Sequence, residues 1–173
     1  MRYPCGNRSE ETNNYKPNTN EMFKIVEKRK LAENIYEMKI AAERVAKAAQ
    51  PGQFVIVRAD EGGERVPLTI ADYDVERGTV TIVTQTIGHS TKKICALEAG
   101  DSLADFAGPL GRPSEFVHMP EEELKKRKYL FVAGGVGTAP VYPQVKWLHE
   151  HGIAADVIVG SKTKDLLILE EEM

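Results

Sequence analysis

A glycine-rich turn between a predicted strand and a predicted helix is the feature of this sequence best suited to bind a ligand. The apolar run at residues 129–133 is too short for a helix and predicts a strand buried on both faces. Gly134, Gly135 and Gly137 follow it, and glycines let a flat or charged ligand approach the main chain closely. Strand, glycine turn and helix N-terminus together predict an anion site. A tight turn that binds nothing is the alternative.

The predicted helix after this turn begins at Thr138, whose hydroxyl can cap free amide groups. Pro140 suits the first turn of a helix, and Val145 and Leu148 continue an apolar face at helical spacing. Pro140 also stands where the usual dinucleotide fingerprint has its third glycine. The turn is therefore not the standard Rossmann signature.

Arg65 is a second candidate for ligand binding, because it follows a glycine turn and enters a predicted strand with Pro67 and Thr69. Proline removes a donor from the ladder of hydrogen bonds, so we expect this strand at a sheet edge or a bulge. An arginine there is free to clamp a phosphate through two parallel hydrogen bonds. Thr69 could offer its hydroxyl to a ligand ring. A surface arginine beside an edge strand is the alternative.

Residues 88–91, Gly-His-Ser-Thr, form a third motif that leads into a short helix predicted over residues 92–97. Ser90 or Thr91 can cap this helix, and its free amide groups can bind a phosphate. Ordinary capping is the better interpretation when the motif is taken alone. Cys95 lies on the same helix among apolar neighbours, which predicts a buried structural thiol.

No side chain in the sequence has the pattern of a nucleophile with a base and an orienting group, so we predict no catalytic side chain. Chemistry here has to come from a cofactor. The two cysteines, Cys5 and Cys95, lie too far apart and in contexts too different to predict a disulfide framework or a metal site. They suggest a reducing, cytoplasmic setting.

The whole sequence limits the class of protein further. Its 173 residues fit one or two small domains, and its net charge of −3 gives no reason to expect nucleic acid as a partner. No apolar run approaches the length of a membrane span. Residues 1–21 are polar and almost free of apolar side chains, so we expect a disordered N-terminal extension.

The remaining sequence predicts an antiparallel β-barrel followed by a truncated α/β Rossmann-like domain. Short alternating segments at regular spacing are typical of a barrel or sandwich. The segments are residues 23–26, 35–40, 53–58, 65–71, 79–86 and 102–106, the last closed by a turn at 108–111. Residues 41–50 are alanine-rich and imitate a helix. A second parallel strand at 155–160 completes about half of a doubly wound sheet, so we expect a fragment of a longer protein.

The order of four motifs resembles the ferredoxin–NADP reductase superfamily. The motifs are residues 65–69, 88–91, 108–111 and 134–140. More closely, the sequence is similar to the flavin subunit shared by NADH-dependent ferredoxin:NADP oxidoreductases, sulfide dehydrogenases and the electron-transfer subunit of dihydroorotate dehydrogenase. The resemblance covers residues 22–173. It implies a Greek-key FAD-binding barrel over residues 22–119 and the first part of an NAD(P)-binding domain over 120–173.

The resemblance also implies which residues bind the cofactors. For FAD, it places Arg65 at the pyrophosphate, Pro67, Leu68 and Thr69 along the flavin ring, Thr84, Gln85 and Thr86 beside the ribityl and adenosine part, and Gly88, Ser90 and Thr91 at a phosphate. For the nicotinamide nucleotide, NAD(H) or NADP(H), it places Gly135, Gly137 and Thr138 along its border.

The function implied is that of a flavoprotein oxidoreductase subunit that passes electrons between NAD(P)H, FAD and an iron–sulfur, ferredoxin-type or partner-subunit acceptor. Its partners would be a larger catalytic subunit, of the glutamate synthase-like or dehydrogenase type, and ferredoxin. Relatives carry a cysteine cluster for a [2Fe–2S] centre near their C-terminus, and this sequence has no such cluster before Met173. A subunit that binds little or no flavin and serves for docking or regulation is the alternative.

Overall fold

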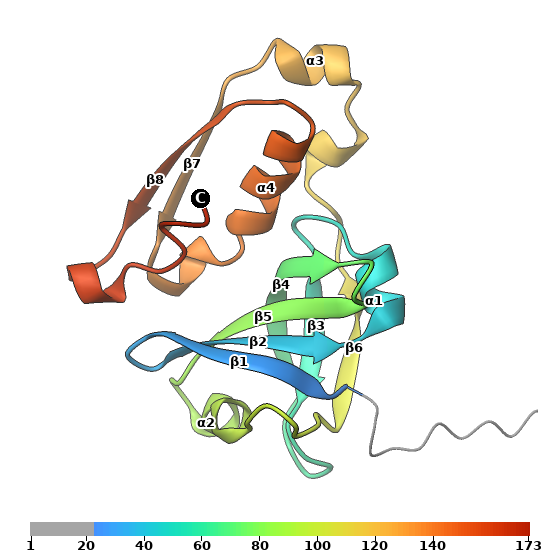
Figure 1. Ribbon diagram of the computed structural model, residues 1–173, viewed down its shortest axis with the longest axis vertical. Coiled ribbons are helices and arrows are strands. Elements are labelled where there is room, and N and C mark those ends of the chain that lie inside the picture. Colours follow the sequence, from blue (N-terminus) through green and yellow to red (C-terminus); the bar gives the residue numbers. More distant parts are fainter. Residues whose placement is uncertain (1–22) are drawn as a thin grey trace, which may run out of the picture.

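The computed structural model describes residues 23–173, which form two units stacked one above the other (Figure 1). The extension predicted for residues 1–21, including Cys5, lies outside the described residues.

The first unit is a six-stranded antiparallel barrel, as the alternating segments predict. Its strands follow the order β1 (Ile25–Ala32), β2 (Ile35–Ala41), β5 (Thr79–Gln85), β4 (Val66–Asp74), β3 (Phe54–Arg58) and β6 (Asp105–Leu110). Main-chain hydrogen bonds close the barrel beside β1: Ile25 N–H donates to the Asp101 carbonyl over 2.8 Å, and Leu103 N–H to the Phe23 carbonyl over 3.1 Å. Apolar side chains such as Met38, Ile82 and Phe106 fill the interior.

Two predictions about the barrel are wrong in detail. Residues 108–110 are not a closing turn but the end of β6, because Ala107 and Leu110 pair with Ile56 and Phe54 of β3. The alanine-rich stretch 41–50 does contain a helix, α1 (Glu43–Ala48). Helix α1 forms because Val45 and its neighbour Ala46 bury an apolar face against the barrel.

The strand that follows Arg65 is not an edge strand. β4 lies between β3 and β5, so of the two expectations from Pro67, an edge strand or a bulge, the edge strand is wrong for the strand as a whole. Pro67 is tolerated because at this end β4 pairs only with β3, opposite Ile56, and pairing with β5 begins at Ile70. A shift of register follows between Ile70 and Asp72.

The second unit is built on two parallel strands, β7 (Tyr129–Gly134) and β8 (Ala155–Gly160). The short helices η1 (Glu115–His118) and α3 (Glu121–Lys125) precede β7. Between β7 and β8 lie η2 (Gly135–Thr138) and α4 (Tyr142–Glu150), and η3 (Lys164–Leu166) follows β8. Phe131 on one face of the strands packs in the same cluster as Leu148 of α4. On the other face Leu130 and Val132 are 61% and 69% exposed. The prediction that this strand is buried on both faces is therefore wrong.

The two units are joined by an apolar cluster and an ion pair. Ala71 and Val83 of the barrel share a cluster with Ala139, which follows η2. Nearby, the Lys146 ammonium on α4 lies 2.7 Å from a carboxylate oxygen of Asp72 on β4. This packing holds the glycine loop of the second unit against strands β4 and β5.

We expect main-chain amides of β5 to exchange with solvent deuterium severalfold more slowly than those of β7 and β8. β5 is hydrogen-bonded between two strands and its side chains at residues 80–83 are buried. Within residues 23–173, β7 pairs with β8 alone and exposes one apolar face. Native-state hydrogen exchange read by NMR or mass spectrometry checks this at residues 80–83, 130–133 and 157–159. Equal protection would contradict it and would mean that the two units open together.

Candidate functional site

Arg65 lies at the entrance to β4 with most of its side chain in solvent. One of its terminal nitrogens is 3.2 Å from a carboxylate oxygen of Asp105, at the start of β6. The arginine side chain is 63% exposed, and a pair this exposed contributes little to stability. The guanidinium is thus accessible to a ligand from solvent.

The helix predicted over residues 92–97 begins earlier, as α2 (His89–Ala96) with Gly88 at its N-cap. Thr91 closes the cap from inside the first turn, because its Oγ1 accepts hydrogen bonds from the N–H of Ile87 and of Gly88 over 3.1 and 3.0 Å. Ser90 does not cap the helix. Its hydroxyl donates instead to the Glu64 carboxylate, on the loop that precedes Arg65.

The predicted phosphate-binding motifs are therefore neighbours in space. Glu64 stands next to Arg65 in the chain and contacts Ser90, which is 26 residues away in sequence. Beside this contact lies a cavity of about 240 Å³ between the loop and α2, lined by Ala59, Gly62, Gly63, Glu64, His89, Ser90 and Lys93. A second tie between loop and helix is the ion pair of Lys93 with Asp60, at 2.8 Å, which lowers the pKa of the Asp60 carboxyl. Glu64 and Asp105 were not predicted from the sequence, where nothing but their charge marks them.

Glycine is not required by tight packing at the predicted ligand-binding positions. A Cβ added at Gly88, Gly135 or Gly137 would meet no atom within 4 Å among the described residues. At Gly108, by contrast, it would lie 2.6 Å from Cγ1 of Val55, so that glycine serves packing. Gly135 also has φ +54°, in the left-handed region that glycine adopts easily. The main chain at these open glycines is accessible to a flat ligand.

The glycine turn does not lead directly into α4. Residues 135–138 form η2, and α4 begins at Tyr142 with Pro143, not Pro140, in its first turn. Thr138 makes no capping hydrogen bond to α4, contrary to the prediction, because it lies inside η2. The glycine amides are thus separated from the N-terminus of α4.

Two buried threonine hydroxyls lack a partner within the part of the chain that the structure describes. Thr138 is fully buried and Thr84, near the end of β5, is 1% exposed. Buried hydroxyls are almost always hydrogen-bonded to protein or to ordered water, so each of these marks a place where a ligand or water would complete the site. Both belong to the predicted cofactor-binding set.

The members of that set not yet placed lie on β4 and at the end of β5. Pro67 is exposed on β4, and Leu68 and Thr69 are half-buried beyond it. Gln85, the last residue of β5, and Thr86 after it are half-buried as well. Because Ala71 and Ala139 share one cluster, the strand with Thr69 and the loop with Gly137 lie on the same side of the barrel. The roles of these residues toward a cofactor stay predictions.

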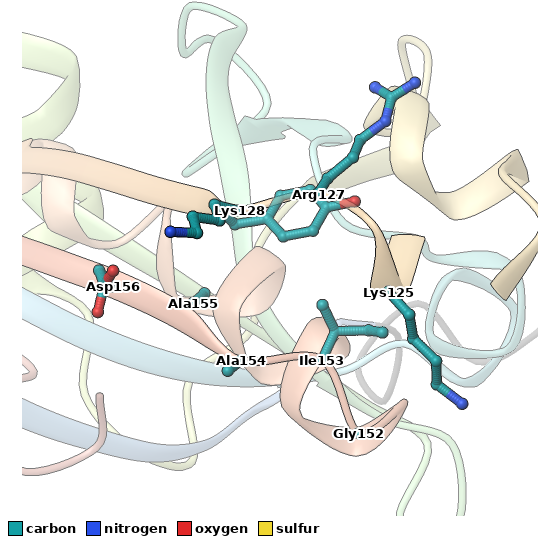
Figure 2. A pocket seen from close by; sticks show the side chains of 9 residues that line it. Lys125, Arg127, Lys128, Gly152, Ile153, Ala154, Ala155 and Asp156 are labelled. Carbon is teal, nitrogen blue, oxygen red and sulfur yellow. The ribbon is translucent and has the colours of Figure 1, made fainter. Parts of the chain in front are cut away.

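A larger hollow, of about 340 Å³, lies at the other end of the second unit and is less suited to a ligand. It is lined by Tyr129 and Ala155, the first residues of the two parallel strands, whereas ligands of α/β sheets bind beyond the carboxyl ends of strands. Figure 2 shows that its cationic side chains, Lys125, Arg127 and Lys128, point in different directions and do not converge.

Cys95 behaves as the sequence predicts. Its side chain is buried on α2 and its Sγ lies 3.8 Å from the Thr84 carbonyl oxygen. Burial raises the pKa of the thiol, which disfavours the reactive thiolate. Within residues 23–173 no group of three or more His, Cys, Asp or Glu side chains is arranged to hold a metal ion. Nor does any helix in that range have the length and apolar character needed to cross a membrane.

Comparison with known proteins gives several relatives, although no family model matches the chain. A Clostridium beijerinckii protein named "Uncharacterized protein in adh 3'region" is 66% identical over 152 residues, which are 88% of this chain and 51% of the relative. A Thermotoga maritima protein named "Dihydroorotate dehydrogenase B (NAD(+)), electron transfer subunit homolog" is 40% identical over 86% of this chain and 50% of its own length. The chain thus spans about half the length of these relatives.

Solved structures agree with the relatives. An NADH-dependent reduced ferredoxin–NADP oxidoreductase has a TM-score of 0.78 and 39% sequence identity, over 87% of this chain and 52% of its own. Phthalate dioxygenase reductase has a TM-score of 0.66 over 87% of this chain and 46% of its own; its 19% identity supports a likeness of fold alone.

The barrel followed by a parallel βα unit therefore defines the class of two-domain reductases in which a flavin-binding barrel precedes a nucleotide-binding domain. The chain belongs to the ferredoxin–NADP reductase superfamily. Its relatives include proteins named as electron transfer subunits, as the order of the four motifs predicts.

Proposed function

We propose that the chain binds FAD on the barrel and NAD(P)H at the glycine loop of its second unit, as part of an electron-transfer subunit. The observation that carries this proposal is the hydrogen bond from Ser90 to Glu64, the residue before Arg65, because it brings two distant motifs together beside one cavity. The arginine and the serine both suit an anion. When bound, the flavin would supply the redox chemistry, by accepting a hydride from NAD(P)H and passing single electrons onward.

In this proposal the protein binds and orients, and its residues fall into two groups. Arg65 binds the pyrophosphate, while Ser90 and the main chain at Gly88 bind a phosphate, with Thr91 shaping the turn. Leu68 and Thr69 lie along the flavin ring, and Gly135 and Gly137 let the nicotinamide approach it. The cluster that joins Ala71 to Ala139 supports the last step, because it holds the strand of Thr69 near the glycine loop.

The partners follow from the relatives and belong to the proposal. Proteins named as electron transfer subunits of dihydroorotate dehydrogenase B match this chain, which favours a larger catalytic subunit as the acceptor of electrons. Ferredoxin is a second acceptor, by likeness to the ferredoxin–NADP oxidoreductase. We propose a cytoplasmic setting, in keeping with the free thiol of Cys95.

The purified chain should be yellow, with the two absorption bands of bound flavin, or should regain them when FAD is added after flavin removal. Riboflavin, which has the same ring but no phosphates, is the matched control. We expect it to bind far more weakly than FAD, because Arg65 and Ser90 would then have no anion to hold. A colourless protein that does not bind added FAD would refute the proposal and favour a docking or regulatory subunit.

A further inference from the structure

Both side chains that we assign to the phosphates of FAD are occupied by carboxylates of the protein itself. The Ser90 hydroxyl donates to Glu64, and the Arg65 guanidinium lies 3.2 Å from Asp105. Carboxylate and phosphate oxygens are both anionic hydrogen-bond acceptors. Each carboxylate therefore makes the contact with Ser90 or Arg65 that we assign to a phosphate of FAD. The ion pair of Arg65 with Asp105 is exposed to solvent on the arginine side. Glu64, in contrast, contacts Ser90, which is half-buried and lines the cavity.

We propose that Glu64 competes with FAD for Ser90 and lowers the affinity of the site for the cofactor. This inference rests on the proposed function. The Glu64 carboxylate and the FAD pyrophosphate carry charge of the same sign and require the same donor, so they cannot share it. When FAD binds, the Glu64 side chain has to give up its hydrogen bond to Ser90, and its negative charge remains near the anionic phosphates. Both effects lower the affinity for FAD.

The structure shows how Glu64 can leave without disturbing the barrel. The main chain of Glu64 is fixed on both sides. After it, β4 pairs with β3 from Val66 onward, and before it, Asp60 forms an ion pair with Lys93. The side chain of Glu64 itself is exposed. Rotation of this side chain into solvent therefore frees Ser90 while the loop stays in place. In the structure the same contact joins the loop to α2.

The test is a titration of flavin-free protein with FAD, followed by the quenching of flavin fluorescence. Glu64→Gln removes the negative charge and keeps the shape, and we expect it to bind FAD about threefold to tenfold more tightly than the parent at low salt. The gain should shrink in high salt, because salt screens charges in solvent. Glu61→Gln is the matched control: it removes the same charge from the exposed end of the same loop, and we expect less than a twofold change.

The outcomes separate this inference from the function on which it rests. Parent and Glu64→Gln binding FAD with equal affinity, or the variant binding more weakly, would overturn the inference and leave the proposed function intact. Weaker binding would mean that Glu64 holds a hydroxyl of FAD. If neither parent nor variant binds FAD, the proposed function fails and this inference fails with it. A gain equal in Glu61→Gln would also overturn it, because the effect would then belong to net charge and not to Ser90.

Discussion

Replacing Arg65 with alanine should weaken FAD binding by about tenfold to a hundredfold. The variant loses a charge-assisted contact with the pyrophosphate, worth roughly 1.5–3 kcal/mol. The fold should be little changed, because the arginine side chain is mostly in solvent and its pair with Asp105 is open. A titration of flavin-free protein with FAD measures the loss, and thermal unfolding of the same sample without FAD checks the fold.

Two further variants sharpen this result. Arg65→Lys keeps the charge but loses the planar fork of donors, so its affinity should lie between those of the parent and of Arg65→Ala. Arg44→Ala removes an exposed arginine from α1 and should leave FAD affinity unchanged. Equal affinity of Arg65→Ala and the parent would show that Arg65 is a surface residue beside β4 and that the pyrophosphate binds elsewhere.

The barrel could be predicted because each of its strands carries its own signal. Alternating side chains and turn residues are local, and they locate β2 and β5 within a residue or two. The errors lie where pairing with a segment distant in the sequence determines the bounds of a strand. β6 extends over residues 105–110 because β3 is there to pair with it, and Pro67 is accepted inside the sheet because one side of β4 is unpaired at that point.

The candidate site shows the same division. Arg65, Ser90 and the open glycines could be named from the sequence as candidates, because their residue types and spacing indicate groups able to bind anions. Their roles toward a cofactor come from the resemblance and stay predictions. Their carboxylate partners could not be named from the sequence. Glu64 meets Ser90 only because the loop before β4 folds back onto α2, and an acidic residue in a glycine turn looks like an ordinary surface residue. The start of α4 was missed because η2 intervenes, which depends on the positive φ of Gly135.

Thr138→Val should raise the free energy of unfolding of the second unit by about 1–3 kcal/mol, because valine replaces a buried hydroxyl without a described partner by a methyl group of similar size. The chain has one tryptophan, Trp147, which packs on Phe116 in this unit, so its fluorescence during urea unfolding reports the change. Thr84→Val removes the other such hydroxyl, in the barrel, and is the matched control.

The two threonine variants should differ in function although they share a cause of stabilisation. With FAD bound, Thr138→Val should slow reduction of the flavin at low NADH concentration, because its hydroxyl borders the nicotinamide in our proposal, whereas Thr84→Val should not change the dependence on NADH. A stabilised Thr138→Val protein with unaltered NADH dependence would remove Thr138 from the site. Loss of stability would show instead that the hydroxyl has a partner, such as an ordered water, in the folded protein. In our proposal Thr138 lowers the stability of the fold and improves binding, because its buried hydroxyl gains a hydrogen-bond partner when the ligand binds. Such a trade between stability and function is common at binding sites in packed cores.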